Sequence, residues 1–305
     1  MKRLMVVLVL GVLMGEGFAN DPGKTAMAFL KVGQGARITA MGEAFVGLAD
    51  DVNALYWNPA GLSQIKDRQA TFMYLKPFQE FDGLSYSHIA TTIPRGKDGS
   101  YGISLSYFGY GKEEKTDIDS GGNAITGLGN WTAFDSLFTV GGAMRLQKNL
   151  SVGASAKLIY GEIDKSNATG IACDIGCLYL PRIKNTTLGA VIKNIGTNIK
   201  FEKDSDPLPI CVKLGLSHKF DRLPIIFVAD ATIPNDNDPY IGTGLEATIQ
   251  NTFAIRLGAR SGPADEGSGL TAGLGINHRL FSFDFAYQPG DSLGDSYFVS
   301  LSTKY

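Results

Sequence analysis

Between Gln69 and the C-terminus, apolar and polar residues alternate along segments that are separated by clusters of turn residues. Segment 101–107 is a clear example, because its tyrosines, isoleucine and leucine alternate with glycine and serine. A period of two residues is typical of a β-strand with one apolar and one polar face. The same alternation occurs in segments 150–160, 210–217, 253–260, 270–277, 281–288 and 296–305. Over the whole chain the pattern predicts about fourteen strands, and hence an all-β fold.

The composition of these segments favours strands that cross a membrane. A membrane-spanning strand needs only ~9–11 residues with every second one apolar, whereas a membrane helix needs ~20 consecutive apolar residues. No run after residue 14 approaches the helical length, and the chain contains 38 glycines, 17 phenylalanines and 12 tyrosines. A soluble β-sandwich would show similar alternation, so the pattern alone does not separate the two folds.

The lengths of the predicted connections separate them. Residues 147–149, 181–185, 250–251 and 278–279 form short connections, whereas 112–130, 196–207 and 261–268 form long ones. Short turns at one end and long loops at the other are typical of a transmembrane barrel, with the turns in the periplasm. An even number of strands also returns both chain ends to the periplasm. We therefore predict an antiparallel up-and-down transmembrane β-barrel over residues 67–305.

The first 19 residues have the pattern of a secretory signal peptide. Lys2 and Arg3 precede the apolar run 4–14, and Gly17-Phe18-Ala19 provides a small-residue exit. Cleavage after Ala19 removes two of the 28 basic residues and one of the 30 acidic ones, which leaves a net charge of about −3. This balance does not suggest nucleic acid as a partner. We expect Sec-dependent export and location in the bacterial outer membrane, among its lipids.

Residues 20–66 lack the alternation and read as a separate unit. Asp50 or Asp51 can accept hydrogen bonds from the free amides that open a helical turn, and Pro59 forces Asn58 out of the helical region. A barrel of fourteen strands is intermediate between filled eight-stranded barrels and sixteen-stranded open channels. Its lumen therefore needs a filling, and the small residues of segment 36–49 suit close packing there. We predict that residues 20–66 form a helical plug.

This block also carries a family resemblance. Gly33-Gln34-Gly35-Ala36-Arg37, Ala40-Met41-Gly42-Glu43-Ala44 and Asn58-Pro59-Ala60 resemble the N-terminal signature of the PorV/PorQ branch of FadL-like outer-membrane barrels. The resemblance implies that the plug is a hatch; a static cork is the alternative. We expect Asn58-Pro59-Ala60 to fix the plug beside the first strand. The motif residues are Gly42, Asp50, Asp51, Trp57, Asn58, Pro59, Ala60 and Gly61.

Charged residues also fall on the polar faces of the predicted strands, which face the lumen. Their mixed signs argue against a pore that is selective for cations or anions and favour ion pairs between wall and plug. These residues are Arg145, Lys157, Asp174, Lys213, Asp230, Glu246, Arg256, Arg260 and Asp284, together with Asp135. On the last strand, Tyr297 and the terminal Tyr305 share the apolar face. A terminal aromatic residue there resembles the recognition signal of the barrel-assembly machinery, which we expect as a partner.

The remaining motifs do not predict an enzyme, a metal site or a cofactor. Of three histidines, His218 and His278 fall on the outward face, away from any nucleophile in the lumen. Cys173 and Cys177 are too far apart along one strand for a disulfide, and the cysteines lack zinc-site spacing. The run 235–238 is rich in Asn and Asp, and we interpret it as a solvated turn rather than a calcium site.

Two classes of function remain. The FadL-like resemblance implies a monomeric channel that passes hydrophobic or amphipathic small molecules toward the periplasm or sideways into the bilayer. The PorV-like resemblance implies a component of type IX protein secretion that binds secreted proteins through its outer loops. An apolar, aromatic lining beneath the loops would favour the first class, and a fully plugged polar lumen the second. The polar loop 112–130, without an aromatic cluster, slightly disfavours tight protein docking.

Overall fold

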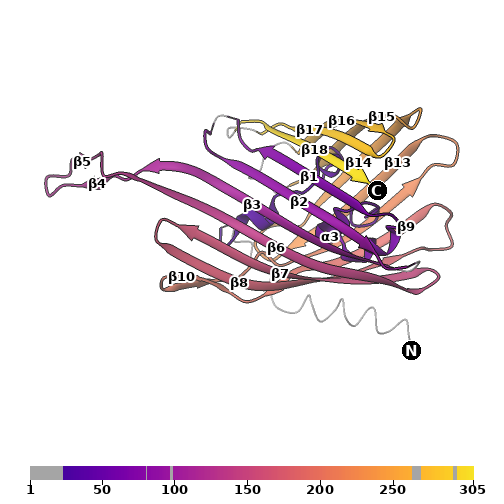
Figure 1. Cartoon of the computed structure of the whole chain (residues 1–305), viewed down its shortest axis with the longest axis horizontal. Helices are drawn as coiled ribbons and strands as arrows, with labels where there is room; N and C mark the ends of the chain where they lie inside the picture. The colour runs from indigo at the N-terminus through magenta and orange to yellow at the C-terminus, as the bar shows by residue number, and fades with distance from the viewer. Residues whose placement is uncertain (1–22, 80, 97–98, 263–268, 291–293) are drawn as a thin grey trace.

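The computed structural model describes residues 23–79, 81–96, 99–262, 269–290 and 294–305 as a closed antiparallel β-barrel (Figure 1). The predicted signal peptide, residues 1–19, lies outside the described residues. Fourteen strands form the barrel, as the alternation predicts, and β1 pairs with β18 to close it. Among the described residues, no helix is long and apolar enough to span a membrane.

Each barrel strand pairs with its neighbours in chain order, and two small hairpins, one of β4 and β5 and one of β10 and β11, extend from the barrel loops. The barrel strands are β1 (Gln69–Lys76), β2 (Ser85–Pro94), β3 (Ser100–Glu114), β6 (Asn130–Gln147), β7 (Leu150–Ile163), β8 (Ser166–Tyr179), β9 (Thr186–Gly196), β12 (Cys211–Lys219), β13 (Ile225–Pro234), β14 (Tyr240–Ile249), β15 (Phe253–Arg260), β16 (Leu270–His278), β17 (Phe281–Gln288) and β18 (Ser296–Lys304). The hairpins are β4 (Asp117–Ile118) with β5 (Ala124–Ile125), and β10 (Ile199–Phe201) with β11 (Asp204–Asp206).

The strand connections divide between the two ends of the barrel largely as predicted. The β6–β7, β14–β15 and β16–β17 turns are short, and the long β3–β6 connection carries β4 and β5 far beyond the barrel (Figure 1). The β7–β8 turn, residues 164–165, is an exception, because it is short but lies at the long-loop end. We call the long-loop end outer and the short-turn end inner.

The strands alternate between the lumen and the outer surface with the predicted parity. On β7, Lys157 is 3% exposed toward the lumen, whereas the next residue, Leu158, is 49% exposed on the outside. The same alternation makes Cys173 and Cys177 half-buried residues of the outer face of β8. The apolar outer surface is what a strand needs in contact with lipid, and the buried inner surface is what contact with a plug produces.

The N-terminal block fills the lumen with four short helical turns. These are η1 (Ala28–Lys31), α2 (Ala36–Thr39), α3 (Ala54–Trp57) and η2 (Pro59–Gln64). Every residue from 33 to 63 is buried except Arg37, Asp50 and Asp51, which are half-buried. Asn58 adopts extended backbone angles after α3, so the helix ends before Pro59 as predicted. We call residues 23–66 the plug.

Two places in the plug require a glycine because the backbones of plug and wall touch. Gly42 has a φ of +65°, and a Cβ there would lie 2.5 Å from the carbonyl oxygen of Thr243 on β14. On β9, Gly189 faces Val46 of the plug, and any side chain at Gly189 would overlap the Val46 carbonyl. The plug is therefore seated directly on the strands rather than suspended in the lumen by side chains.

The turn at Asn58 does not lie where we expect it from the sequence. Its amide Nδ2 donates to the Cys177 carbonyl oxygen on β8 at 3.1 Å, and η2 packs on β6, β7 and β8. The expected position beside β1 is therefore wrong. The plug crosses the lumen before the chain enters β1. The sequence pattern does not show which strands a plug segment contacts on the way.

Candidate functional site

The plug has a cavity on each side, and segment 50–57 contributes to both. The inner cavity, about 290 Å³, lies at the short-turn end and is lined by Arg37, Asp50, Asp51, Glu246, Arg256 and Asp284 with polar strand ends. The outer cavity, about 50 Å³, lies beneath the long loops and is lined by Tyr56, Trp57, Lys193, Lys213, Tyr240 and Arg260, among others. Segment 50–57 therefore faces both cavities. Its acidic residues line the inner cavity, and its aromatic residues line the outer cavity.

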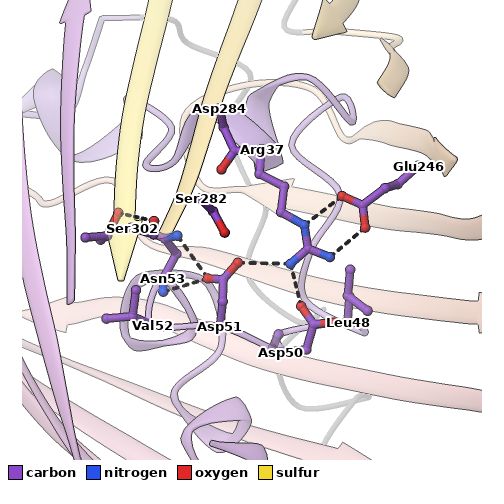
Figure 2. A network of polar contacts seen from close by, with 12 residues as sticks. Arg37, Leu48, Asp50, Asp51, Val52, Asn53, Glu246, Ser282, Asp284 and Ser302 are labelled. Carbon is purple, nitrogen blue, oxygen red and sulfur yellow. Dashed lines mark hydrogen bonds and ion pairs between the residues drawn. The ribbon is translucent and has the colours of Figure 1, made fainter. Parts of the chain in front are cut away.

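Arg37 is the centre of the polar network in the inner cavity (Figure 2). Its guanidinium donates to both carboxylate oxygens of Glu246 on β14, each at 2.8 Å, and this planar two-bond geometry is the strongest form of such a pair. The same side chain donates to Asp50 at 2.7 Å and to Asp51 at 3.0 Å. Arg37 therefore connects the plug segment at residues 50 and 51 to the barrel wall.

The wall side of this network continues across two more strands. Arg256 on β15 donates to Glu246 at 2.6 Å and to Asp284 on β17 at 2.7 Å. All three side chains are nearly fully buried. Glu246 therefore accepts from both a plug arginine and a wall arginine, so the carboxylate stays paired even in the lumen.

Asp51 is also fixed from within the plug. Its Oδ1 accepts from the backbone amide and the side-chain Nδ2 of Asn53, both at 2.9 Å, just before α3 begins. Burial raises the pKa of Asp51 above its ordinary value, and the opposing effect of the Arg37 guanidinium does not cancel this shift. The Asp51 charge is therefore held at an energetic cost.

The aromatic side chains at the outer cavity are held rigidly by their polar atoms. The Tyr56 hydroxyl donates to the Leu30 carbonyl oxygen at 2.9 Å, and Trp57 Nε1 donates to the Gln34 carbonyl oxygen at 2.8 Å. Their ring faces meet lysines from the wall. Lys193 Nζ lies 3.4 Å from the Tyr56 ring centroid, and Lys213 Nζ lies 4.7 Å from the Trp57 ring. These distances are within the range of cation–π interactions.

Several other buried polar contacts attach the plug to the wall. Asp230 on β13 accepts from the backbone amides of Phe45 at 2.7 Å and Val46 at 2.8 Å. Arg260 on β15 donates to Glu43 at 3.0 Å. Asn58 bridges the Val46 and Cys177 carbonyl oxygens and accepts from Ala60, which starts η2 on Pro59.

Most of the predicted lumen charges are buried in the lumen. Lys157 and Asp174 form a buried ion pair of 2.7 Å within the wall, and Lys157 also donates to Asn194. Asp135 is buried and accepts from Tyr110. Arg145 is the exception in burial: it pairs with the buried Ser151 on β7, but it is exposed near the inner end of β6. Arg145 therefore has the predicted inward parity but does not join the buried lumen charges.

The motif residues Trp57, Pro59, Ala60 and Gly61 are all buried, and Gly61 packs against Ala49 too closely for any side chain. The ring of Tyr297 lies 5.6 Å from that of Tyr287 in a tilted arrangement, and Tyr305 is exposed at the end of the chain. These positions leave the assembly-signal role of the two tyrosines a prediction.

Sequence reasoning missed four contributors to the site. Lys193 has the inward parity of β9 and was detectable from its spacing. Glu43 and Tyr56 belong to the plug, where no periodicity marks a functional face. Asp236 was interpreted as part of a solvated turn, and this is wrong: it is 2% exposed and forms an ion pair with Lys31 of the plug.

The lumen is also more apolar than the strand pattern predicts. Phe29 and Leu30 of the plug join Leu137 and Ile159 of the wall in one buried cluster with other inner-face residues. Further members include Met73, Leu75, Tyr86, Phe108, Leu208 and Phe298. Because Leu208 belongs to the β9–β12 connection, this apolar cluster reaches the long-loop end. In the described part of the chain, His, Cys, Asp and Glu side chains form no group of three that could hold a metal ion.

Comparison with known proteins supports the assignment of the fold. The model of an uncharacterised protein family (UPF0164) matches residues 14–229. The Pseudomonas putida toluene transporter TodX has a similar structure, with a TM-score of 0.66, 13% identity, and 90% of this chain and 99% of that chain covered. A Pseudomonas aeruginosa FadL homologue gives a TM-score of 0.60 at 13% identity, with 89% and 98% covered. No curated protein matches the sequence.

Proposed function

The chain belongs to the uncharacterised protein family UPF0164, and we propose that it is a plugged outer-membrane channel that takes up small hydrophobic or amphipathic molecules. The fold is that of outer-membrane barrels such as TodX, which is a toluene transporter, and the FadL homologue. The motif at residues 33–62 further suggests the PorV/PorQ branch of this fold. Transport is our inference for this chain, since the low identity to both relatives supports the fold alone.

The observation that carries this proposal is the apolar cluster of the lumen, next to the outer cavity. Phe29, Leu30 and Leu208 bring apolar side chains to the loop end of the lumen, and Leu30 also lines the outer cavity. A mixture of buried apolar and aromatic surface with a few polar groups is typical of sites for small ligands.

Uptake into proteoliposomes tests the proposal. We expect purified protein to accelerate the entry of labelled toluene or labelled octanoate over liposomes without protein. A variant, Trp57→Ala, removes one of the aromatic side chains that line the outer cavity and should slow entry, whereas Lys148→Ala, at an exposed turn, should not. Entry rates equal to those of empty liposomes for both substrates would contradict the channel.

A second candidate function has one observation in its favour. The hairpin of β4 and β5 projects far from the barrel (Figure 1), and its Ile118 is 71% exposed with Leu128 nearby in sequence at 49%. Exposed apolar residues on a projecting arm suit a protein partner, as in a secretion component. Deletion of residues 115–129 should then cause secreted surface proteins to accumulate in the periplasm while small-molecule uptake is unchanged. Normal secretion in the deletion strain would exclude this role for the arm.

A further inference from the structure

Two buried lysines of the outer cavity differ from the other lumen cations in their partners. Lys193 is 2% exposed and Lys213 is 5% exposed. Lys157 and Arg260 reach the carboxylates of Asp174 and Glu43, but no carboxylate of the described residues forms an ion pair with Lys193 or Lys213. A buried charge without a counter-ion is unfavourable, and the ring faces of Tyr56 and Trp57 offset only part of that cost.

The charges around the outer cavity leave about one positive charge uncompensated. Lys31, Lys193, Lys213 and Arg260 line it. Asp236 neutralises Lys31, and Glu43 neutralises Arg260. Asp230 offsets part of the Lys213 charge from a distance, but its Oδ2 accepts from two plug amides. One monovalent anion between Lys193 and Lys213 would balance the remainder.

The size and lining of the cavity narrow the chemistry of that anion. A cavity of about 50 Å³ is several times the ~10–15 Å³ that one water molecule needs, so it holds a small head group. Leu30, Pro209 and Pro234 place apolar surface beside the lysines. We propose that the outer cavity binds a single carboxylate group between the Lys193 and Lys213 ammonium groups, beside the rings of Tyr56 and Trp57.

The carboxylate has two possible sources, which share the same binding chemistry. It can be a free small acid such as acetate, or the head group of a longer amphipathic acid whose tail extends toward the loops. This inference rests on the proposed channel function, because the carboxylate site would define the chemical class of molecule that the channel takes up. Binding in detergent is measured without transport, so the two proposals fail separately: absent uptake with intact binding contradicts the channel, and absent binding contradicts the site.

Tryptophan fluorescence reports on this site directly. The chain has two tryptophans, so Trp131→Phe leaves Trp57 as the only emitter. In a non-ionic detergent at constant pH and ionic strength, acetate and octanoate are titrated against their neutral counterparts acetamide and octanol. We expect each acid to cause a saturable change in Trp57 fluorescence and its neutral counterpart to cause none. Saturation by both acids at similar concentrations identifies a site for the free anion, and at least tenfold tighter binding of octanoate identifies a head-group site.

Lysine variants in the same background test the assignment to residues. Lys193→Met and Lys213→Met should each weaken carboxylate binding at least tenfold, whereas Lys148→Met, at an exposed turn, should leave it unchanged. The difference in migration between unheated and heated protein on denaturing gels checks that each variant is folded, since the compact folded barrel migrates faster than the denatured chain. The acid-to-neutral comparison in the Trp131→Phe protein needs no lysine variant, so it remains decisive if one fails to fold. Equal responses to acid and neutral compound, or folded lysine variants that bind like the parent, would overturn the proposal.

Discussion

Arg37 of the plug and Glu246 of β14 form a two-bond ion pair, with both donor–acceptor distances at 2.8 Å. The pair joins residues that are distant in sequence, and it is the point where the plug is tied to the wall at the inner end. Because the Arg37 guanidinium also reaches Asp50 and Asp51, one side chain determines how the motif segment lies on the barrel. Arg37 is therefore the main ionic link at the inner end of the plug, beside the weaker Lys219–Asp50 pair at 3.5 Å.

Replacing Arg37 by alanine should loosen the plug. The change leaves Glu246 with only Arg256 as a cation partner, leaves Asp50 with only Lys219 at 3.5 Å, and removes the cation partner of Asp51. Breaking one member of a buried pair costs roughly 3–5 kcal/mol, and the partial exposure of Arg37 places this case near the lower end. We expect frequent channel openings in planar bilayers, whereas the parent protein stays closed. Lys148→Ala is the matched control, since it removes a cation from an exposed turn; a closed Arg37→Ala barrel would contradict the role of the pair.

Replacing Asp51 by asparagine should leave the channel closed, unlike the replacement of Arg37. Its pKa is raised in the folded protein, mainly by burial, so the folded state binds this proton more tightly than the unfolded state does. The stabilisation from protonated Asp51 is present at low pH and is lost as the pH rises through the raised pKa. We therefore expect Asp51→Asn to stay closed at neutral pH and to show a weaker pH dependence of thermal unfolding than the parent. An Asp51→Asn protein that opens like Arg37→Ala would show that the Asp51 charge is needed.

The parts of the fold that depend on strand parity were predictable from the sequence. Lys157 and Leu158 lie on opposite faces because successive side chains of a strand must do so, and the alternation in the chain displays this directly. Arg145 keeps the predicted parity, since it pairs with the buried Ser151, but it is exposed because it lies near the inner end of β6. Parity thus predicts burial more securely in the middle of a strand than at its ends.

The arrangement inside the lumen was much less predictable. Leu137 and Ile159 face inward although the alternation favours polar inner faces, because the plug supplies the apolar side chains of Phe29 and Leu30 that cover them. The position of Asn58 is set by its contact with the Cys177 carbonyl, and plug segments have no repeating pattern that would reveal such a partner. The barrel wall follows from strand alternation and the pairing of neighbouring strands. The position of the plug depends instead on individual side-chain contacts.

Asn58 should be the least replaceable polar residue of the motif. It is fully buried, its Nδ2 donates to the Val46 and Cys177 carbonyl oxygens, and its Oδ1 accepts from Ala60. Asn58→Ala leaves these groups unsatisfied, at about 1–3 kcal/mol for each buried group. We expect a lower melting temperature of the folded barrel in detergent and plug cleavage by added protease. Gln64→Ala removes two hydrogen bonds within the plug from a side chain that is only half-buried, so it should have a smaller effect on both measurements.

Gly189 tests whether the plug is seated on the wall itself. A side chain there would overlap the Val46 carbonyl, so Gly189→Val should prevent the plug from seating while β9 still pairs with β8 and β12. We expect a folded barrel with raised conductance. The control is Gly122→Ala in the β4–β5 hairpin, which meets open space and should change nothing in the lumen. Gly170→Val on β8 is unsuitable as a control, because Ile199 lies against Gly170. A closed Gly189→Val barrel would indicate that the plug and wall can separate without opening a path.

Deleting residues 33–62 removes α2, α3 and most of η2 while leaving every barrel strand intact. The fourteen strands keep their pairing, including β1 with β18, so the shortened protein should still insert into a membrane. Its lumen loses the side chains that cover Leu178 and Val228, the amide partners of Asp230, and the plug partner of Glu246, which keeps only Arg256. Water should enter this space, because buried carboxylates without partners require hydration. We expect steady ion conduction in planar bilayers, in contrast to the closed parent protein and the full-length Gly122→Ala control. A deletion variant that inserts but does not conduct would mean that the β-strands alone, with their loops, close this barrel.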